Sequence, residues 1–193
     1  MADFRAITVF CDAVIHLLKT NCRLEDFGNI PLAFQVGMPR VSKPITSGVT
    51  LSLYRIYPNS SNRIPAGRVN PDGTRQKTKL PIDLHLLLTA WGNEPSLQLT
   101  IAGWMMRVLE DTPIIPVNLL NSGDKDVFKQ DEDVEITIGE LTNDDLFRIW
   151  EKLTDLPYQI SVPYVARNVR IESDQLVIGG KNVLERKFLN RKA

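Results

Sequence analysis

Apolar residues recur at steps of three and four along three segments of the chain, the spacing of amphipathic helices. The first segment predicts a helix over residues 4–20 with Asp3 as its N-cap. The second predicts a helix that has Pro95 in its first turn and ends before Pro113, because proline is tolerated only at a helix start. The third is opened by Thr142 and Asp145, which resemble a capping box with Asp in place of the usual Glu.

Alternating apolar and polar residues predict strands. The pattern is clearest over residues 80–91, where one face of the segment is wholly apolar and the opposite face is half apolar. We therefore expect a central strand here. Four further segments show a weaker alternation or a short apolar run, and these are residues 32–36, 49–57, 134–138 and 158–171.

Pro163 interrupts the last of these segments. Proline has no N–H to donate to a sheet and is found mainly in edge strands or bulges. We therefore expect the strand over residues 158–171 at an edge of the sheet, where another chain could add a strand through backbone hydrogen bonds. Its candidate interface residues are Tyr158, Ser161 and Tyr164.

These elements predict an α+β fold with a mostly antiparallel or mixed sheet of about five strands and two or three helices. We expect a single domain over residues 1–172, a long loop at 58–79, and a flexible basic tail at 173–193. The predicted core combines one face of the central strand with one stripe of each of the first two helices. Its members are Ile82, Leu84, Leu86, Leu88, Ile7, Cys11, Val14, Leu18, Ile101, Met105 and Val108.

Charge is balanced over the 193 residues, with 23 basic and 23 acidic side chains, but it is separated along the chain. Residues 55–81 hold six basic residues and one acid, whereas residues 110–155 hold thirteen acids and four basic residues. Such segments suit complementary patches between copies of one protein. The candidate patch residues are Arg63, Arg68, Arg75, Lys77 and Lys79 on the basic side, and Asp124, Asp126, Asp131 and Asp133 on the acidic side. The alternative is a nucleic-acid-binding domain that uses the basic loop at 63–79, although such domains are usually net basic.

No catalytic or cofactor site emerges from the spacing of reactive residues. The two cysteines, Cys11 and Cys22, form no CxxC motif, and with only two histidines they predict free thiols and no metal site. His16 and His85 stand alone, without a nucleophile at a suggestive spacing. Because no catalytic or metal-binding arrangement is found, we expect no enzymatic activity and no cofactor. We also find no signal peptide and no apolar run long enough to span a membrane, so we expect a protein that is intracellular when made.

Three segments together resemble the cap, or tail-terminator, proteins of phage-tail-like contractile injection systems. The first is LSLYRIYPN at 51–59, followed by Asn62 and Arg63. The second is LPIDLHLLLTAW at 80–91, followed by a helix that ends in MRVLEDTP at 106–113. The third is LTNDDLFRIWEKL at 141–153, followed by PYQISVPYVAR at 157–167.

This resemblance covers about residues 4–173 and implies a structural protein. Proteins of this family form a six-fold ring on the end of the inner tube furthest from the baseplate, contact the last sheath layer and stop both from growing. The implied partners are therefore further copies of the chain, as a homohexamer, and the terminal rings of sheath and inner tube, with no nucleic acid. The implied location is the cytoplasm, in a particle that is later released or stays anchored.

Overall fold

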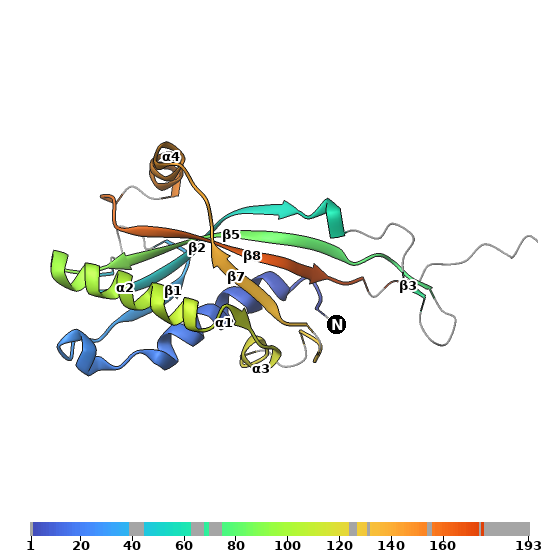
Figure 1. Ribbon diagram of the computed structural model, residues 1–193, viewed down its shortest axis with the longest axis horizontal. Helices are drawn as coiled ribbons and strands as arrows, with labels where there is room; N and C mark the ends of the chain where they lie inside the picture. The colour runs from blue at the N-terminus through green and yellow to red at the C-terminus, as the bar shows by residue number, and fades with distance from the viewer. Residues whose placement is uncertain are drawn as a thin grey trace, which may run out of the picture.

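A six-stranded mixed sheet forms the centre of the molecule (Figure 1). The computed structural model describes residues 2–38, 45–62, 68–69, 75–123, 127–130, 132–153, 156–173 and 175. The strand order is β1–β2–β5–β8–β7–β6, in which β1 runs parallel to β2 and every other neighbouring pair is antiparallel. The strands are β1 (Ala33–Val36), β2 (Gly48–Pro58), β5 (Leu80–Trp91), β8 (Ser161–Ile171), β7 (Val134–Ile138) and β6 (Ile114–Ile115).

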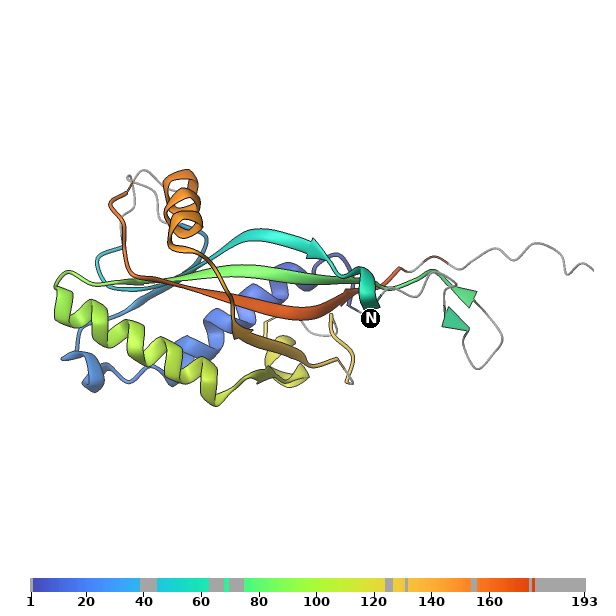
Figure 2. The same ribbon diagram turned by 45° about the horizontal axis from the view of Figure 1, so that its top comes forward.

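Helices cover the two faces of the sheet unequally (Figures 1 and 2). The long helices α1 (Ala6–Asn21) and α2 (Pro95–Asp111) lie on one face together with the one-turn α3 (Val117–Leu120), while α4 (Asn143–Leu153) lies alone on the other. Two 3₁₀ turns, η1 (Leu24–Phe27) and η2 (Ser60–Asn62), follow α1 and β2. A small ribbon of β3 (Arg68–Val69) and β4 (Arg75–Gln76) lies beyond the end of the main sheet. The α+β class and the mixed sheet are as the sequence predicts.

The predicted core is confirmed. The apolar face of β5 is buried against α1 and α2, with Leu84, Leu86 and Leu88 fully inaccessible to solvent. Ile7 and Val108 pack against this cluster but remain partly exposed. Cys11 and Cys22 are free thiols, as expected, and burial raises the pKa of the Cys11 thiol to about 12.

The opposite face of β5 packs under α4. Leu87 and Trp91 of β5 bury themselves against Trp150 of α4. The indole N–H of Trp91 donates to Thr50 Oγ1 at 2.9 Å, which satisfies a polar group inside this second cluster. At the N-terminus of α4 one half of the predicted capping box forms, because the Asp145 N–H donates to Thr142 Oγ1 at 3.2 Å. The Asp145 carboxylate accepts from the Thr142 hydroxyl at 2.7 Å, whereas in a full capping box it would accept the Thr142 backbone N–H.

The prediction that the strand over residues 158–171 lies at a sheet edge is wrong. Strand β8 pairs with β5 on one side and with β7 on the other. The Pro163 carbonyl accepts a hydrogen bond from Gly139 N, just past Ile138 where β7 ends. The backbone N and O of Pro163 therefore point to the β7 side and away from β5. Opposite Leu87 of β5, the proline therefore removes no ladder bond.

Residues 113–120, which show no periodicity, contain both β6 and α3. These elements are too short for a repeating pattern to develop. The long loop at 58–79 also carries η2 and the β3–β4 ribbon. The tail beyond residue 175 lies outside the described residues, so the boundary at 172 stays a prediction.

Candidate assembly surfaces

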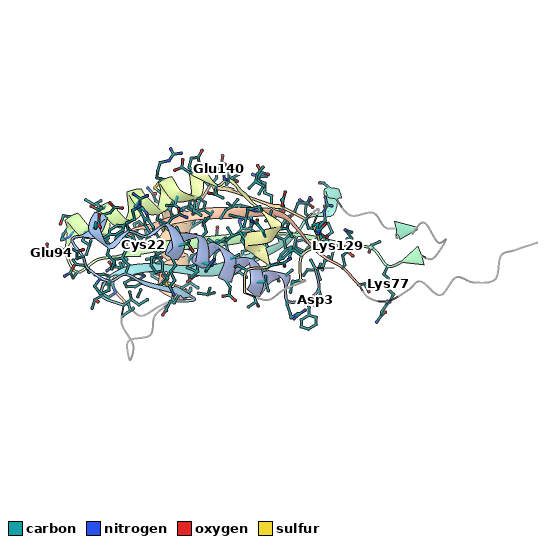
Figure 3. The ribbon with its side chains drawn as sticks, turned by 90° about the horizontal axis from the view of Figure 1, so that it is seen from below. Asp3, Cys22, Lys77, Glu94, Lys129 and Glu140 are labelled. Carbon is teal, nitrogen blue, oxygen red and sulfur yellow. The ribbon has the colours of Figure 1, made fainter. Side chains whose placement is uncertain are left out.

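The basic loop is placed only in part. Arg68 and Arg75 lie in the β3–β4 ribbon, and Arg63 lies outside the described residues. Lys77 is exposed, and its ammonium group contacts Gln175 Oε1. Lys77 and Lys129 lie at the same end of the molecule, from which the ribbon projects (Figure 3).

An ionic network within one chain holds Lys79. Its Nζ lies 3.3 Å from Glu132 Oε1 and also contacts Glu172, which in turn lies 3.2 Å from Lys129 Nζ. Glu132 closes the network by accepting the Lys129 backbone N–H at 3.0 Å. The network joins the start of β5, the end of β8 and the segment before β7. The charge pattern suggested that the basic and acidic segments meet between copies, but the contact of Lys79 with Glu132 forms inside one chain.

Glu172 is the centre of this network, and its side chain is only 4% exposed. Burial raises the pKa of the Glu172 carboxyl, but the hydrogen bonds and charges of Lys79 and Lys129 outweigh that effect and hold the pKa below its ordinary value. A lowered pKa means that ionised Glu172 stabilises the folded state. This contribution is complete above the ordinary glutamate pKa of 4.5 and is lost as the pH falls through the lowered value.

We predict that Glu172→Gln lowers the free energy of unfolding by about 1–3 kcal/mol at neutral pH, since a charged hydrogen-bond partner of both lysines is lost. The difference from the native protein should shrink as the pH falls from 4.5 through the lowered pKa of Glu172, because the carboxyl then becomes protonated. Urea titrations at several pH values measure both effects. The control is Glu151→Gln on the exposed side of α4, which should change stability by about 0.5 kcal/mol or less. An equal loss in the two variants would contradict the network's role.

The acidic candidates are also divided. Asp133 accepts the Val117 N–H at 3.0 Å and so holds the start of α3, although its own surface is exposed. Asp124, Asp126 and Asp131 lie outside the described residues.

Of the three candidates on the last strand segment, only Tyr158 reaches the surface, with 43% of its area exposed. Tyr164 is 2% exposed in the main core, and burial raises the pKa of its hydroxyl to about 12. Ser161 is buried and hydrogen-bonds Thr89 Oγ1 at 2.9 Å. The interior position of β8 therefore removes Ser161 and Tyr164 from the surface of the single chain.

An aromatic cluster on α4 is a surface feature that the sequence pattern did not single out. The ring of Tyr158 lies 5.1 Å from that of Phe147 and 5.4 Å from that of Trp150, centroid to centroid. Trp150 in turn contacts Trp91 at 6.0 Å. The series runs from the buried second face of the sheet to Phe147, which is 48% exposed, and so presents a rigid apolar surface. The amphipathic pattern of residues 143–153 is the sequence signal that could have indicated this aromatic surface.

A groove lies beside this helix, between α4 and the strands β2 and β5. It has a volume of about 610 Å³ and is lined by Tyr54, Arg55, His85, Glu140, Leu141, Asp145, Arg148, Ile149, Lys152 and Leu153. The Tyr54 and His85 rings meet edge to face at 5.9 Å. The sequence could not reveal this groove, because it depends on which face of the sheet α4 occupies.

In the part of the chain that the structure describes, no three His, Cys, Asp or Glu side chains gather as a metal-binding group. None of the described helices combines the length and the apolar character needed to cross a membrane.

The fold is shared with terminator proteins of contractile injection particles. One solved structure, the PVC sheath/tube terminator of an extracellular contractile injection system in the extended state, matches 97% of this chain with a TM-score of 0.61 at 13% identity. A second, the tube-terminating cap of the anti-feeding prophage, matches 94% of this chain with a TM-score of 0.59 at 14% identity. The chain spans only 64% and 59% of those two proteins' lengths.

The family itself is shown by the sequence. The profile of the Pvc16 N-terminal domain matches residues 15–185, and the chain belongs to this family. A search of curated proteins found no match to the chain.

Proposed function

We propose that this chain is a structural cap that terminates the baseplate-distal end of the inner tube and sheath of a contractile injection system. The observation that carries the proposal is the family match over residues 15–185, supported by a fold shared with two terminators. A nucleic-acid-binding domain, the alternative, receives no support from these likenesses. The proposed role is binding without catalysis.

The proposed partners are further copies of the chain, in a homohexameric ring, and the last rings of sheath and tube. A closed ring requires a heterologous interface, in which one patch meets a different patch on the next copy. The charge-separated sequence and the exposed aromatic surface of α4 supply unlike patches for that purpose. We propose assembly in the cytoplasm, where the particle is made.

The experiment is to delete the gene from the cluster that encodes the particle and to measure tube and sheath lengths by electron microscopy. A cap predicts long, irregular tubes or sheaths, and uniform length should return when the full chain is supplied again. Particles of normal, uniform length without the protein would refute the proposal. Light scattering and negative-stain images of the purified chain test the ring separately.

The basic loop at 63–79 is proposed to contact a neighbouring copy or the sheath. Lys79 is excluded from this set because its charge is satisfied inside the chain. We predict that charge reversal at Arg68, Arg75 and Lys77 weakens ring formation or docking, with a larger effect at low salt, where exposed charges are less screened. Thermal unfolding should stay unchanged, since the β3–β4 ribbon is separate from the main sheet and Lys77 is exposed. Reversed protein that still forms rings and gives particles of uniform length would remove the loop from the mechanism.

A further inference from the structure

The groove between α4 and the sheet combines cations with apolar surface. Its positive groups come from two elements: Arg55 from β2, and Arg148 and Lys152 from successive turns of α4. Its apolar lining includes Tyr54, Ile149 and Leu153, which are half-buried against the second core cluster.

These cations differ from four others in the described chain. Arg5, Lys79, Arg107 and Lys129 each form an ion pair with a carboxylate. Among the described residues, Arg55, Arg148 and Lys152 form none, and all three are exposed. The Arg55 guanidinium instead lies 5.0 Å over the Tyr57 ring. The groove therefore presents three exposed cations that form no ion pair with a carboxylate of the described chain.

The two carboxylates in the lining lie at the start of α4 or just before it. Asp145 belongs to the first turn of α4 and is held by the Thr142 hydroxyl, and Glu140 precedes that helix. Arg148 and Lys152 follow one and two turns later. The lining thus carries carboxylates at the start of α4 and cations further along that helix, and the carboxylates would repel a phosphate backbone passing the start of the helix.

We propose that this groove binds a short, extended protein segment in which acidic and apolar residues alternate, contributed by another chain of the assembly. The charge complementarity comes from Arg55, Arg148 and Lys152, and Tyr54, Ile149 and Leu153 supply the apolar contact. The assignment of the partner to the assembly rests on the proposed capping function, whereas the binding chemistry rests on the groove alone.

His85 reports on occupancy of the groove. Burial lowers the pKa of its imidazole, and the charges of Arg55 and Arg167 lower it further, against the opposing effect of Asp83. A carboxylate bound beside His85 would favour the protonated ring and raise that pKa. The chain has only one other histidine, His16, which lies on α1 on the other face of the sheet and serves as an internal control.

The test uses the full chain and a synthetic peptide of alternating glutamate and leucine. The ring-proton resonances of the two histidines are followed by NMR through a pH titration, with and without the peptide. We expect the pKa of His85 to rise on binding, whereas the ring-proton resonances of His16 should not respond to the peptide. The same peptide with lysine in place of glutamate should not bind.

Removing two of the groove's charges should weaken the complex. For Arg148→Gln with Lys152→Gln we expect a dissociation constant roughly 2- to 30-fold higher, the range for two exposed charge pairs. The matched control, Lys19→Gln with Arg23→Gln, removes two exposed cations outside the groove and should leave the affinity unchanged. Circular dichroism checks that α4 remains folded in the first variant.

Three results would overturn the inference. The first is an equal peptide affinity in the two double variants, and the second is equal binding of the lysine and glutamate peptides. The third is a rise in the His85 pKa with a single-stranded oligonucleotide but not with the glutamate peptide. The last of these assigns the groove to nucleic acid. The capping function is tested independently by particle length, so a cap whose groove binds no acidic peptide would retain its function while this inference falls.

Discussion

Leu84→Ala is expected to lower the free energy of unfolding by about 2–5 kcal/mol, the range for removing a large aliphatic side chain from a packed core. Leu84 is fully buried on β5, whose neighbours β2 and β8 are themselves internal strands, and its face packs under the α1–α2 layer. The space left by the missing atoms can collapse only if the sheet and this layer move together. Denaturant titration followed by tryptophan fluorescence measures the loss.

The matched control is Leu80→Ala, the same substitution at the start of the same strand. Leu80 is 43% exposed, so it gains less from burial, and we expect a loss of about 1 kcal/mol or less. If the two variants lost the same stability, the buried face of β5 would be assigned wrongly.

The central strand could be predicted to the residue because its pattern carries two independent signals. Alternation defines one face of residues 80–91, and the apolar Leu87 and Trp91 on the other face indicate cover from both sides. Both signals lie within one short segment of the sequence, and each is carried by several residues. The bounds of β7 also match the alternating segment 134–138, and the apolar stripes of α1 and α2 supply buried core residues, because in each case the periodicity follows from burial.

The place of β8 in the sheet could not be read from Pro163 alone. A missing N–H matters only on the side to which it points, and that side is decided by the register with both neighbours. At Pro163 the β5 side needs no bond, and on the β7 side the neighbouring strand has already ended. A rule about proline in strands therefore gave the wrong position.

Charge patterning identified segments but not their partners. Lys79 and Glu132 are 53 residues apart, yet they meet because β5 starts where the segment before β7 passes. The groove beside α4 depends in the same way on tertiary structure, since Arg55 and Arg148 belong to different layers. Composition could indicate that unlike patches exist. It could not indicate which charges the fold satisfies internally and which remain for another chain.

One side chain makes the most buried contact between α4 and the sheet. Among the described residues of this helix, Trp150 alone is buried, at 4% exposure, and its indole N–H donates to the Leu156 carbonyl at 3.3 Å. The remaining apolar residues of α4 are at least partly exposed. The fully buried part of the attachment of α4, and with it of the groove wall, is therefore the contact of Trp150 with Trp91, Leu87 and Tyr158. Leu146, Ile149 and Leu153 add partly buried contacts to the same cluster.

Trp150→Ala should remove about 3–5 kcal/mol of the free energy that holds α4 on the sheet, the range for deleting a buried tryptophan. Because α1 and α2 pack on the opposite face, the loss should be local. We expect amide hydrogen exchange in residues 143–153 to accelerate by about 100-fold or more, while the amides of β5 change far less. Phe147→Ala, which truncates the exposed aromatic residue of the same helix, should leave this exchange within about tenfold of the native rate. Uniform acceleration across the sheet and α4 in Trp150→Ala would show that the helix is part of the global folding unit, and that the groove wall cannot open independently of the core.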